Sequence, residues 1–339
     1  MQLRQACPAL GAALAAIALA LPAPAAAHAD PLPVGPCINL GNHLESPSEN
    51  AWGDHRLSAA DFTRIRAAGF TTVRMPVRWS NKTGDGPDHT IDPAWMARVG
   101  ELVDAALAAD LNLLLNSHNF EELHADPGAN TQKLAAIWRQ IAEHFADRSD
   151  RLWFEIENEP HDAFTNDNLV ATLSPALAAI RETNPTRAVV IGGGNYSGID
   201  SLATLDLPDD ANVHPTFHYY EPFDFTHQGA SWAGDTAANT ITYGRPDDTE
   251  RLARDVAKLR AYVARTGLTP FMGETGAYDG GTSLAQRVAY HAAVNEAFAP
   301  TGIGMCAWGY ANTFPFWDKR TGRWLPGLLT AFGLPEPQE

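Results

Sequence analysis

The chain has 339 residues, of which 45% are hydrophobic and 9% aromatic, and its formal net charge is −16 at pH 7. This composition excludes a disordered or fibrous protein and predicts a globular one. Nucleic acid and anionic membranes are poor partners for so acidic a chain, because both would repel it; a neutral substrate suits it better.

The N-terminal segment has the features of a secretory signal peptide. Arg4 gives a basic start, residues 10–21 are rich in Ala and Leu, and residues 25–27 are small, as a cleavage site requires. The apolar run is short for a membrane span, so an uncleaved anchor is the less favoured alternative. We predict a signal peptide over residues 1–27 and a secreted mature chain, extracellular or periplasmic, over residues 28–339.

Two cysteines remain after the predicted cleavage. Cys7 lies within the signal segment, whereas Cys37 and Cys306 belong to the mature chain. In an exported protein these two could form a disulfide. Two separate buried thiols are an equal alternative, because neither cysteine lies in a Cys-rich or metal-type spacing.

The mature chain alternates short apolar runs with helix-period segments. Strand-like runs occupy residues 37–40, 72–75, 111–116, 152–155, 188–191, 213–219, 270–273 and 304–307. Helical patterns occupy residues 58–68, 93–109, 131–145, 169–182, 248–265 and 283–299. This size and order predict a single (β/α)₈ TIM barrel. An open doubly wound sheet is the alternative, but no Gly-rich phosphate turn follows the first run.

Polar residues follow most of the strand-like runs, and a barrel brings these strand ends to one face. They are Asn42, Glu45, Arg74, His118, Asn158, Glu159, Asn195, His218, Tyr220 and Glu274, with the aromatic Trp308. Carboxylates and amides can bind sugar hydroxyls, and an aromatic face can stack against a pyranose ring. The set therefore predicts a carbohydrate site.

The chain resembles glycoside hydrolase family 5, the cellulase family, over essentially its whole mature length. The motifs that carry the resemblance are residues 73–79 (VRMPVRW), 154–161 (FEIENEPH) and 218–230 (HYYEPFDFTHQGA). They are similar to those of bacterial endo-β-1,4-glucanases of the branch that often also accepts mannans.

The resemblance implies a role for each site residue. Glu159 would be the acid/base and Glu274 the nucleophile, with Arg74 and Tyr220 favouring the charged form of Glu274. The expected substrate-binding residues are Asn42, Glu45, Arg74, His118, Asn158, His218, Tyr220, Trp232 and Trp308. Trp232 could equally be a loop-packing residue. Because the family is retaining, the two carboxyl groups should lie ~5–5.5 Å apart.

Other glutamates near the fourth strand need separate treatment. Glu155 and Glu157 alternate with Glu159, so all three would face one side if the strand ran that far. The resemblance gives Glu155 an inward structural position, whereas Glu157 stands where the relatives are usually apolar. Glu121 and Glu122 are expected on a solvated rim.

We expect a monomeric enzyme without a cofactor. We also expect no catalytic metal, since none of the 12 histidines forms a His-x-His pair. The expected activity is secreted, retaining, endo-acting hydrolysis of β-1,4-glucan. A β-mannanase, a mixed-linkage glucanase or a xyloglucanase is the alternative on the same site. A carbohydrate-binding protein without catalysis is the other class.

Overall fold

The computed structural model describes residues 30–53, 55–234 and 237–336. The predicted signal peptide, residues 1–27, lies outside these ranges. Within them, no helix is both long and apolar enough to cross a bilayer.

Eight parallel strands form a closed barrel in which each strand pairs with the next and β8 pairs with β1. They are β1 (Pro36–Asn39), β2 (Thr72–Met75), β3 (Asn112–Asn116), β4 (Leu152–Glu155), β5 (Val189–Gly192), β6 (Val213–His218), β7 (Phe271–Thr275) and β8 (Met305–Ala307). The predicted single (β/α)₈ barrel is confirmed. Every predicted strand is present, with ends that differ by at most two residues.

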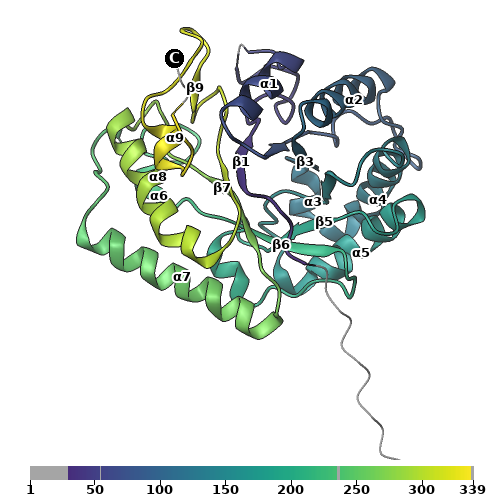
Figure 1. Cartoon of the computed structure of the whole chain (residues 1–339). Coiled ribbons are helices and arrows are strands. Elements are labelled where there is room, and N and C mark those ends of the chain that lie inside the picture. The colour runs from purple at the N-terminus through teal and green to yellow at the C-terminus, as the bar shows by residue number, and fades with distance from the viewer. Residues whose placement is uncertain (1–29, 54, 235–236, 337–339) are drawn as a thin grey trace, which may run out of the picture.

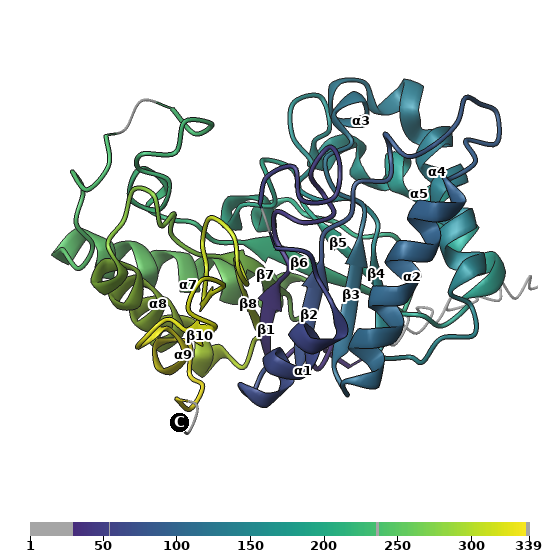
Figure 2. The same cartoon turned by 90° about the horizontal axis from the view of Figure 1, so that it is seen from above.

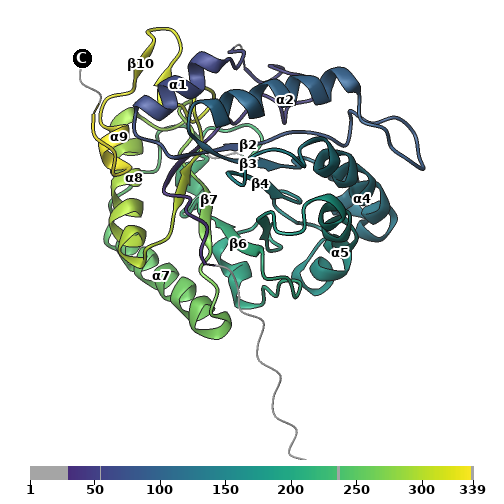
Figure 3. The ribbon, with the colours of Figure 1, turned by 45° about the vertical axis from the view of Figure 1, so that its right-hand side comes forward.

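Helices surround the barrel, as Figures 1 and 3 show. The long ones are α1 (Ala59–Ala67), α2 (Pro93–Ala108), α4 (Pro127–His144), α5 (Asn166–Thr183), α7 (Pro246–Thr266) and α8 (Leu284–Phe298). Local sequence sets their ends. Asp92 and Asp126 each accept a hydrogen bond from a main-chain N–H of the first turn, and each precedes a proline suited to that turn. Gly267 ends α7 in the left-handed region, at φ 73°.

Shorter elements connect or follow the strands. They are α3 (Glu121–Ala125), α6 (Phe223–Thr226), α9 (Leu328–Ala331), the 3₁₀ turns η1 (Ile199–Ala203) and η2 (Ala299–Thr301), and a hairpin of β9 (Trp317–Asp318) with β10 (Arg323–Trp324). Between β5 and β6 the turn η1 takes the place of an α-helix. Figure 2 shows α3 at the edge of the molecule opposite to β10 and α9.

The barrel interior changes from apolar to polar along the strands. A buried cluster inside it includes Cys37, Leu114, Trp153, Val190, Phe271 and Cys306. Two residues further along, where side chains return to the same side, stand the buried Asn39, Asn116 and Glu155, and Arg74 stands two residues beyond the buried Thr72 of β2. The main hydrophobic core lies separately, between strands and helices. The polar layer thus lies beneath the carboxyl ends of the strands, where barrel enzymes hold their active sites.

Cys37 and Cys306 form a disulfide between β1 and β8. The two residues are register partners on adjacent strands and are fully buried. Of the two alternatives for these cysteines, the structure therefore has the bonded pair.

Candidate active site

Arg74, at the carboxyl half of β2, is the centre of the polar layer. Its Nε and Nη2 donate to the two carboxylate oxygens of Glu155, at 2.7 and 2.9 Å. Nη1 donates to Glu274 Oε1 at 2.5 Å and to Asn39 Oδ1 at 2.9 Å, and Nη2 donates to Asn158 Oδ1 at 2.7 Å. All five N–H groups of the guanidinium are used. The side chain is fully buried, so the two carboxylates compensate its charge.

Glu274 lies on β7 and is held at both oxygens. Oε1 accepts from Arg74, and Oε2 accepts from Tyr220 Oη at 2.9 Å. Burial raises the pKa of this carboxyl, while His218, Arg74 and Tyr220 act in the opposite direction. The two contacts expected to favour the charged form are therefore both present.

Glu159 lies four residues beyond the end of β4, in a backbone turn with φ 47°. Its Oε1 is 2.6 Å from His218 Nδ1, at the end of β6. Burial raises the pKa of Glu159 to about 7, against the opposing effects of Arg74 and His161. Burial also lowers the pKa of His218 to about 4, so at neutral pH this imidazole is uncharged.

The carboxyl groups of Glu159 and Glu274 face each other across His218. One oxygen of each, together with a ring nitrogen of His218, lies within 4.8 Å of the others. His218 Nδ1 is 3.6 Å from Glu274 Oε2. The carboxyl groups of Glu159 and Glu274 thus lie side by side at the mouth of the barrel.

Asn158, His118 and Trp308 border this pair. Because Asn158 Oδ1 accepts from Arg74, its NH₂ group remains the available donor. The rings of His118 and Trp308 stack at 5.9 Å with an interplanar angle of 15°. Trp308 also packs against the backbone of Gly41, where a Cβ would approach Cζ2 to 2.7 Å.

Asn42, Glu45 and Trp232 contact their own surroundings. The buried Glu45 carboxylate accepts from the main-chain N–H groups of Asn42 and His43, and burial raises its pKa to about 7. The Asn42 side chain donates to Thr313 Oγ1. Trp232 is 59% exposed, and its ring meets Tyr278 edge-on at 4.9 Å. None of these contacts reaches the facing pair.

The expected alternation of Glu155, Glu157 and Glu159 does not occur, because β4 ends at Glu155 and the chain then turns. Each carboxylate enters a different environment. Glu155 binds Arg74 inside the barrel, Glu159 faces His218, and Glu157 accepts from Ser117 Oγ at 2.7 Å. Glu121 and Glu122 are exposed, as expected of a rim.

Sequence reasoning missed Asn39 and the histidine partner of Glu157. Asn39 Nδ2 donates to the carbonyls of Gly273 and Ala307, which links Arg74 to β7 and β8. His124 Nε2 lies 3.3 Å from Glu157 Oε1 in a buried pair. A polar residue inside an apolar strand is a signal that could have indicated Asn39. His124 lies 33 positions from Glu157 in the sequence, and only the fold brings them together.

A (β/α)₈ barrel with two such carboxyl groups at its strand ends has the architecture of a glycoside hydrolase. Residues 38–313 match the family model of cellulase, glycosyl hydrolase family 5. The chain belongs to this family.

Its relatives include Endoglucanase H of Acetivibrio thermocellus, 35% identical over 277 residues, and Endoglucanase A of Ruminococcus albus, 31% identical over 327 residues. The matches cover 81% and 86% of this chain. The chain spans 29% of the length of Endoglucanase H and 87% of that of Endoglucanase A.

Solved structures agree with this assignment. A hyperthermophilic endo-β-1,4-glucanase in complex with substrate superposes with a TM-score of 0.85 at 35% identity, covering 88% of this chain and 97% of that one. Thermotoga maritima Cel5A in complex with mannotriose gives 0.84 at 32% identity, with the same coverage.

Proposed function

We propose that this protein is a secreted, endo-acting β-glycanase that hydrolyses β-1,4-glucan with retention of anomeric configuration. The observation that carries the proposal is the close approach of Glu159 and Glu274, whose nearest oxygens lie within 4.8 Å. Retaining enzymes hold their carboxyl groups ~5–5.5 Å apart, whereas inverting enzymes leave room for a water molecule.

In the first step, an oxygen of Glu274 attacks the anomeric carbon while Glu159 gives its proton to the leaving glycosidic oxygen. A glycosyl ester on Glu274 forms, and the shortened chain departs. Loss of the negative charge on Glu274 lowers the pKa of the nearby Glu159, which then acts as a base. It removes a proton from water, the water oxygen attacks the anomeric carbon, and the Glu274 carboxylate is released.

Neighbouring residues position the sugar. The NH₂ group of Asn158, which also hydrogen-bonds the Glu159 carboxyl, is the donor for a hydroxyl of the reacting sugar. Trp308 offers an aromatic face at the same mouth, backed by His118. For Asn42, Glu45 and Trp232 a role in more distant sugar binding remains our proposal.

The relatives favour glucan as the substrate and mannan as the second candidate. Endoglucanases are prominent among them, and one solved neighbour was crystallised with mannotriose. A xyloglucan-specific endo-β-1,4-glucanase of Bacteroides ovatus is also related, at 29% identity over 63% of this chain. Product sizing on glucan, mannan and xyloglucan separates these substrates. The Cys37–Cys306 disulfide supports export, because such bonds persist in oxidising compartments.

The Glu274→Gln variant tests the nucleophile. We expect kcat on soluble β-glucan to fall by ~10⁴-fold or more, because no ester can form. A 2-fluoro-cellobioside should label the wild-type protein at Glu274, as peptide mass spectrometry would show. The exposed Glu182→Gln variant is the matched control and should keep full activity. An unchanged rate in Glu274→Gln would refute the assignment, and no hydrolysis by either protein would favour a sugar-binding role.

A further inference from the structure

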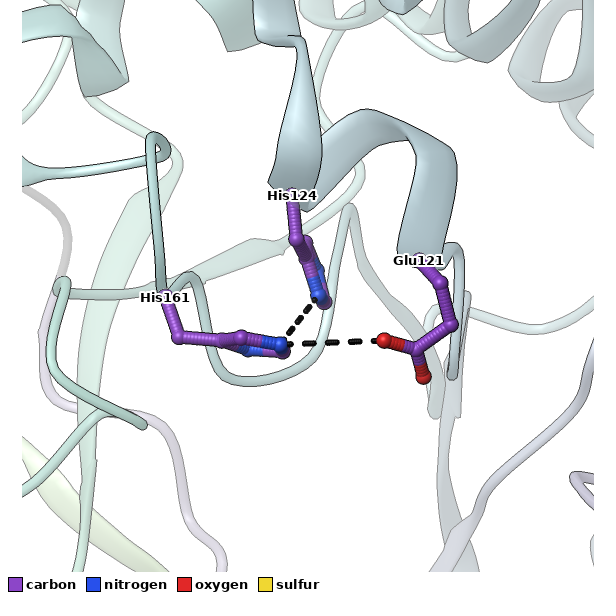
Figure 4. A group of neighbouring side chains, drawn as sticks. All are labelled: Glu121, His124 and His161. Carbon is purple, nitrogen blue, oxygen red and sulfur yellow. Dashed lines mark hydrogen bonds and ion pairs between the residues drawn. The ribbon is translucent and has the colours of Figure 1, made fainter.

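Glu121, His124 and His161 form a cluster that the proposed reaction does not use (Figure 4). Glu121 and His124 lie on α3, and His161 lies in the loop after β4. His124 Nδ1 is 3.1 Å from His161 Nε2, which is 3.7 Å from Glu121 Oε2. All three donor atoms lie within 4.8 Å of one another.

The partners of the two outward ring nitrogens indicate where each histidine carries its hydrogen. His161 Nδ1 is 2.7 Å from the main-chain oxygen of Glu159, which can only accept, so Nδ1 carries the hydrogen and Nε2 presents its lone pair. His124 Nε2 is 3.3 Å from Glu157 Oε1, and a hydrogen there leaves the lone pair on Nδ1. With these tautomers two lone pairs face each other at 3.1 Å, and either a shared proton or a shared cation satisfies both nitrogen atoms.

We infer that Glu121, His124 and His161 bind a divalent transition-metal ion. Two metal–nitrogen bonds of ~2.0–2.1 Å at a tetrahedral angle place the nitrogen atoms ~3.4 Å apart, close to the distance here. Two imidazoles and one carboxylate suit Zn²⁺, Ni²⁺ or Cu²⁺, whereas Ca²⁺ and Mg²⁺ prefer oxygen ligands. The contacts of His161 with a carbonyl and of His124 with a carboxylate match the usual outer support of metal-binding histidines.

The ion would hold two segments of the chain together and would take no part in the hydrolysis. It would join α3 to the loop after β4, and His161 within that loop hydrogen-bonds the main chain of Glu159. The side chain of Glu121 is 62% exposed, so the ion would enter from solvent and keep a water ligand there. The inference concerns binding alone and does not depend on the proposed hydrolase activity.

The test uses the full-length mature protein without a histidine tag, stripped with a chelator. Titration with Co²⁺, followed by its visible absorption, and with Zn²⁺, followed by calorimetry, should show saturation at one ion per chain. Glu121→Gln should weaken binding at least ~10-fold, and so should Glu157→Gln, which removes outer support for His124. The double variant His124→Ala/His161→Ala should lose the site, whereas the exposed His144→Ala should bind like wild type.

Two results would overturn the inference. One is the absence of saturable binding, and the other is binding that survives in the double variant. The second includes an ion held by Glu159, His218 and Glu274, which Glu274→Gln would abolish. The exposed Glu121→Gln variant guards against misfolding, since its metal-free melting temperature should equal that of wild type while the Zn²⁺-induced rise becomes smaller.

Discussion

Arg74 joins the structural and the catalytic parts of the site in one side chain. Its guanidinium binds Glu155, which fixes it inside the barrel, and also orients Glu274 and Asn158. A planar group with five donors does this in one position, whereas an ammonium group has three donors and no fixed plane. The positions of the Glu274 carboxyl and of the Asn158 amide therefore depend on one shared, buried guanidinium.

Replacing Arg74 by Lys should lower both activity and stability. We expect kcat to fall ~100-fold, because Glu274 and Asn158 lose oriented donors. The free energy of unfolding should fall by about 2–4 kcal/mol, because Glu155 loses its bidentate partner in a buried site. Kinetics and urea unfolding measure the two effects. Arg139→Lys, at an exposed pair with Glu182, is the control, and equal behaviour of the two variants would contradict this account.

Glu159 should set the alkaline limit of activity. Burial raises its pKa to about 7, so the carboxyl is protonated below that pH and loses its proton as the pH rises through it. We expect kcat/KM to fall ~10-fold per pH unit above this value, because the acid form is required for departure of the leaving group. Glu159→Ala, assayed on an aryl glycoside with a good leaving group, should lack this limb. A limb that persists in the variant would assign it to another group.

At the scale of single residues, motifs predicted the residues of the site better than the residues that hold them in place. Arg74, Tyr220 and Glu274 are joined as the family resemblance implied, because all three lie at or just beyond the carboxyl ends of β2, β6 and β7. Asn39 and His124 were missed, since their function depends on side chains from distant strands and loops. Alternation failed beyond Glu155, because β4 ends at this residue and the chain then turns, with a positive φ at Glu159.

The helix α2 illustrates how far local sequence determines an element. Asp92 and Pro93 mark its start, and Asp92 Oδ1 accepts from the N–H of Ala94 at 2.8 Å. The sequence predicted this helix to within one residue at its end. By contrast, α3 and α6 have five and four residues, too few to show a helical period, and were not predicted.

Removing the cap of α2 should weaken the fold without affecting the site. Asp92→Ala should lower the free energy of unfolding by ~1 kcal/mol, because a main-chain N–H loses its partner. Urea denaturation measures the change, and kcat should remain that of wild type. Asp85→Ala, at an exposed residue of the preceding turn, should change stability by less than ~0.5 kcal/mol. If Asp92→Ala were as stable as this control, water would replace the hydrogen bond to the Ala94 N–H without loss of stability.

For the whole molecule, alternation of strands and helices was sufficient to predict the closed barrel. Closure of the barrel pairs β1 with β8, two strands that lie far apart in the sequence. The sequence left open whether Cys37 and Cys306 form a disulfide, because their spacing along the chain does not show that their strands become neighbours. The register of Cys37 with Cys306 decides it.

Loss of the disulfide should destabilise the whole barrel. The Cys37→Ala/Cys306→Ala variant should unfold with a free energy lower by about 2–4 kcal/mol, because the bond restricts the unfolded chain over a separation of 269 residues. The midpoint of urea unfolding, compared with that of wild type, measures the loss. An unchanged midpoint in the variant would mean that the disulfide adds nothing to the free energy of unfolding.

The same bond makes the chain between β1 and β8 a covalent ring. A protease that cuts any one surface loop inside this ring opens it but releases no fragment, because both new ends stay attached through the sulfur bridge. Cut protein should migrate as one band in a non-reducing gel and as two after reduction. Nearly every loop that borders the active site lies within the ring, so a single cut there leaves both carboxylates in one molecule.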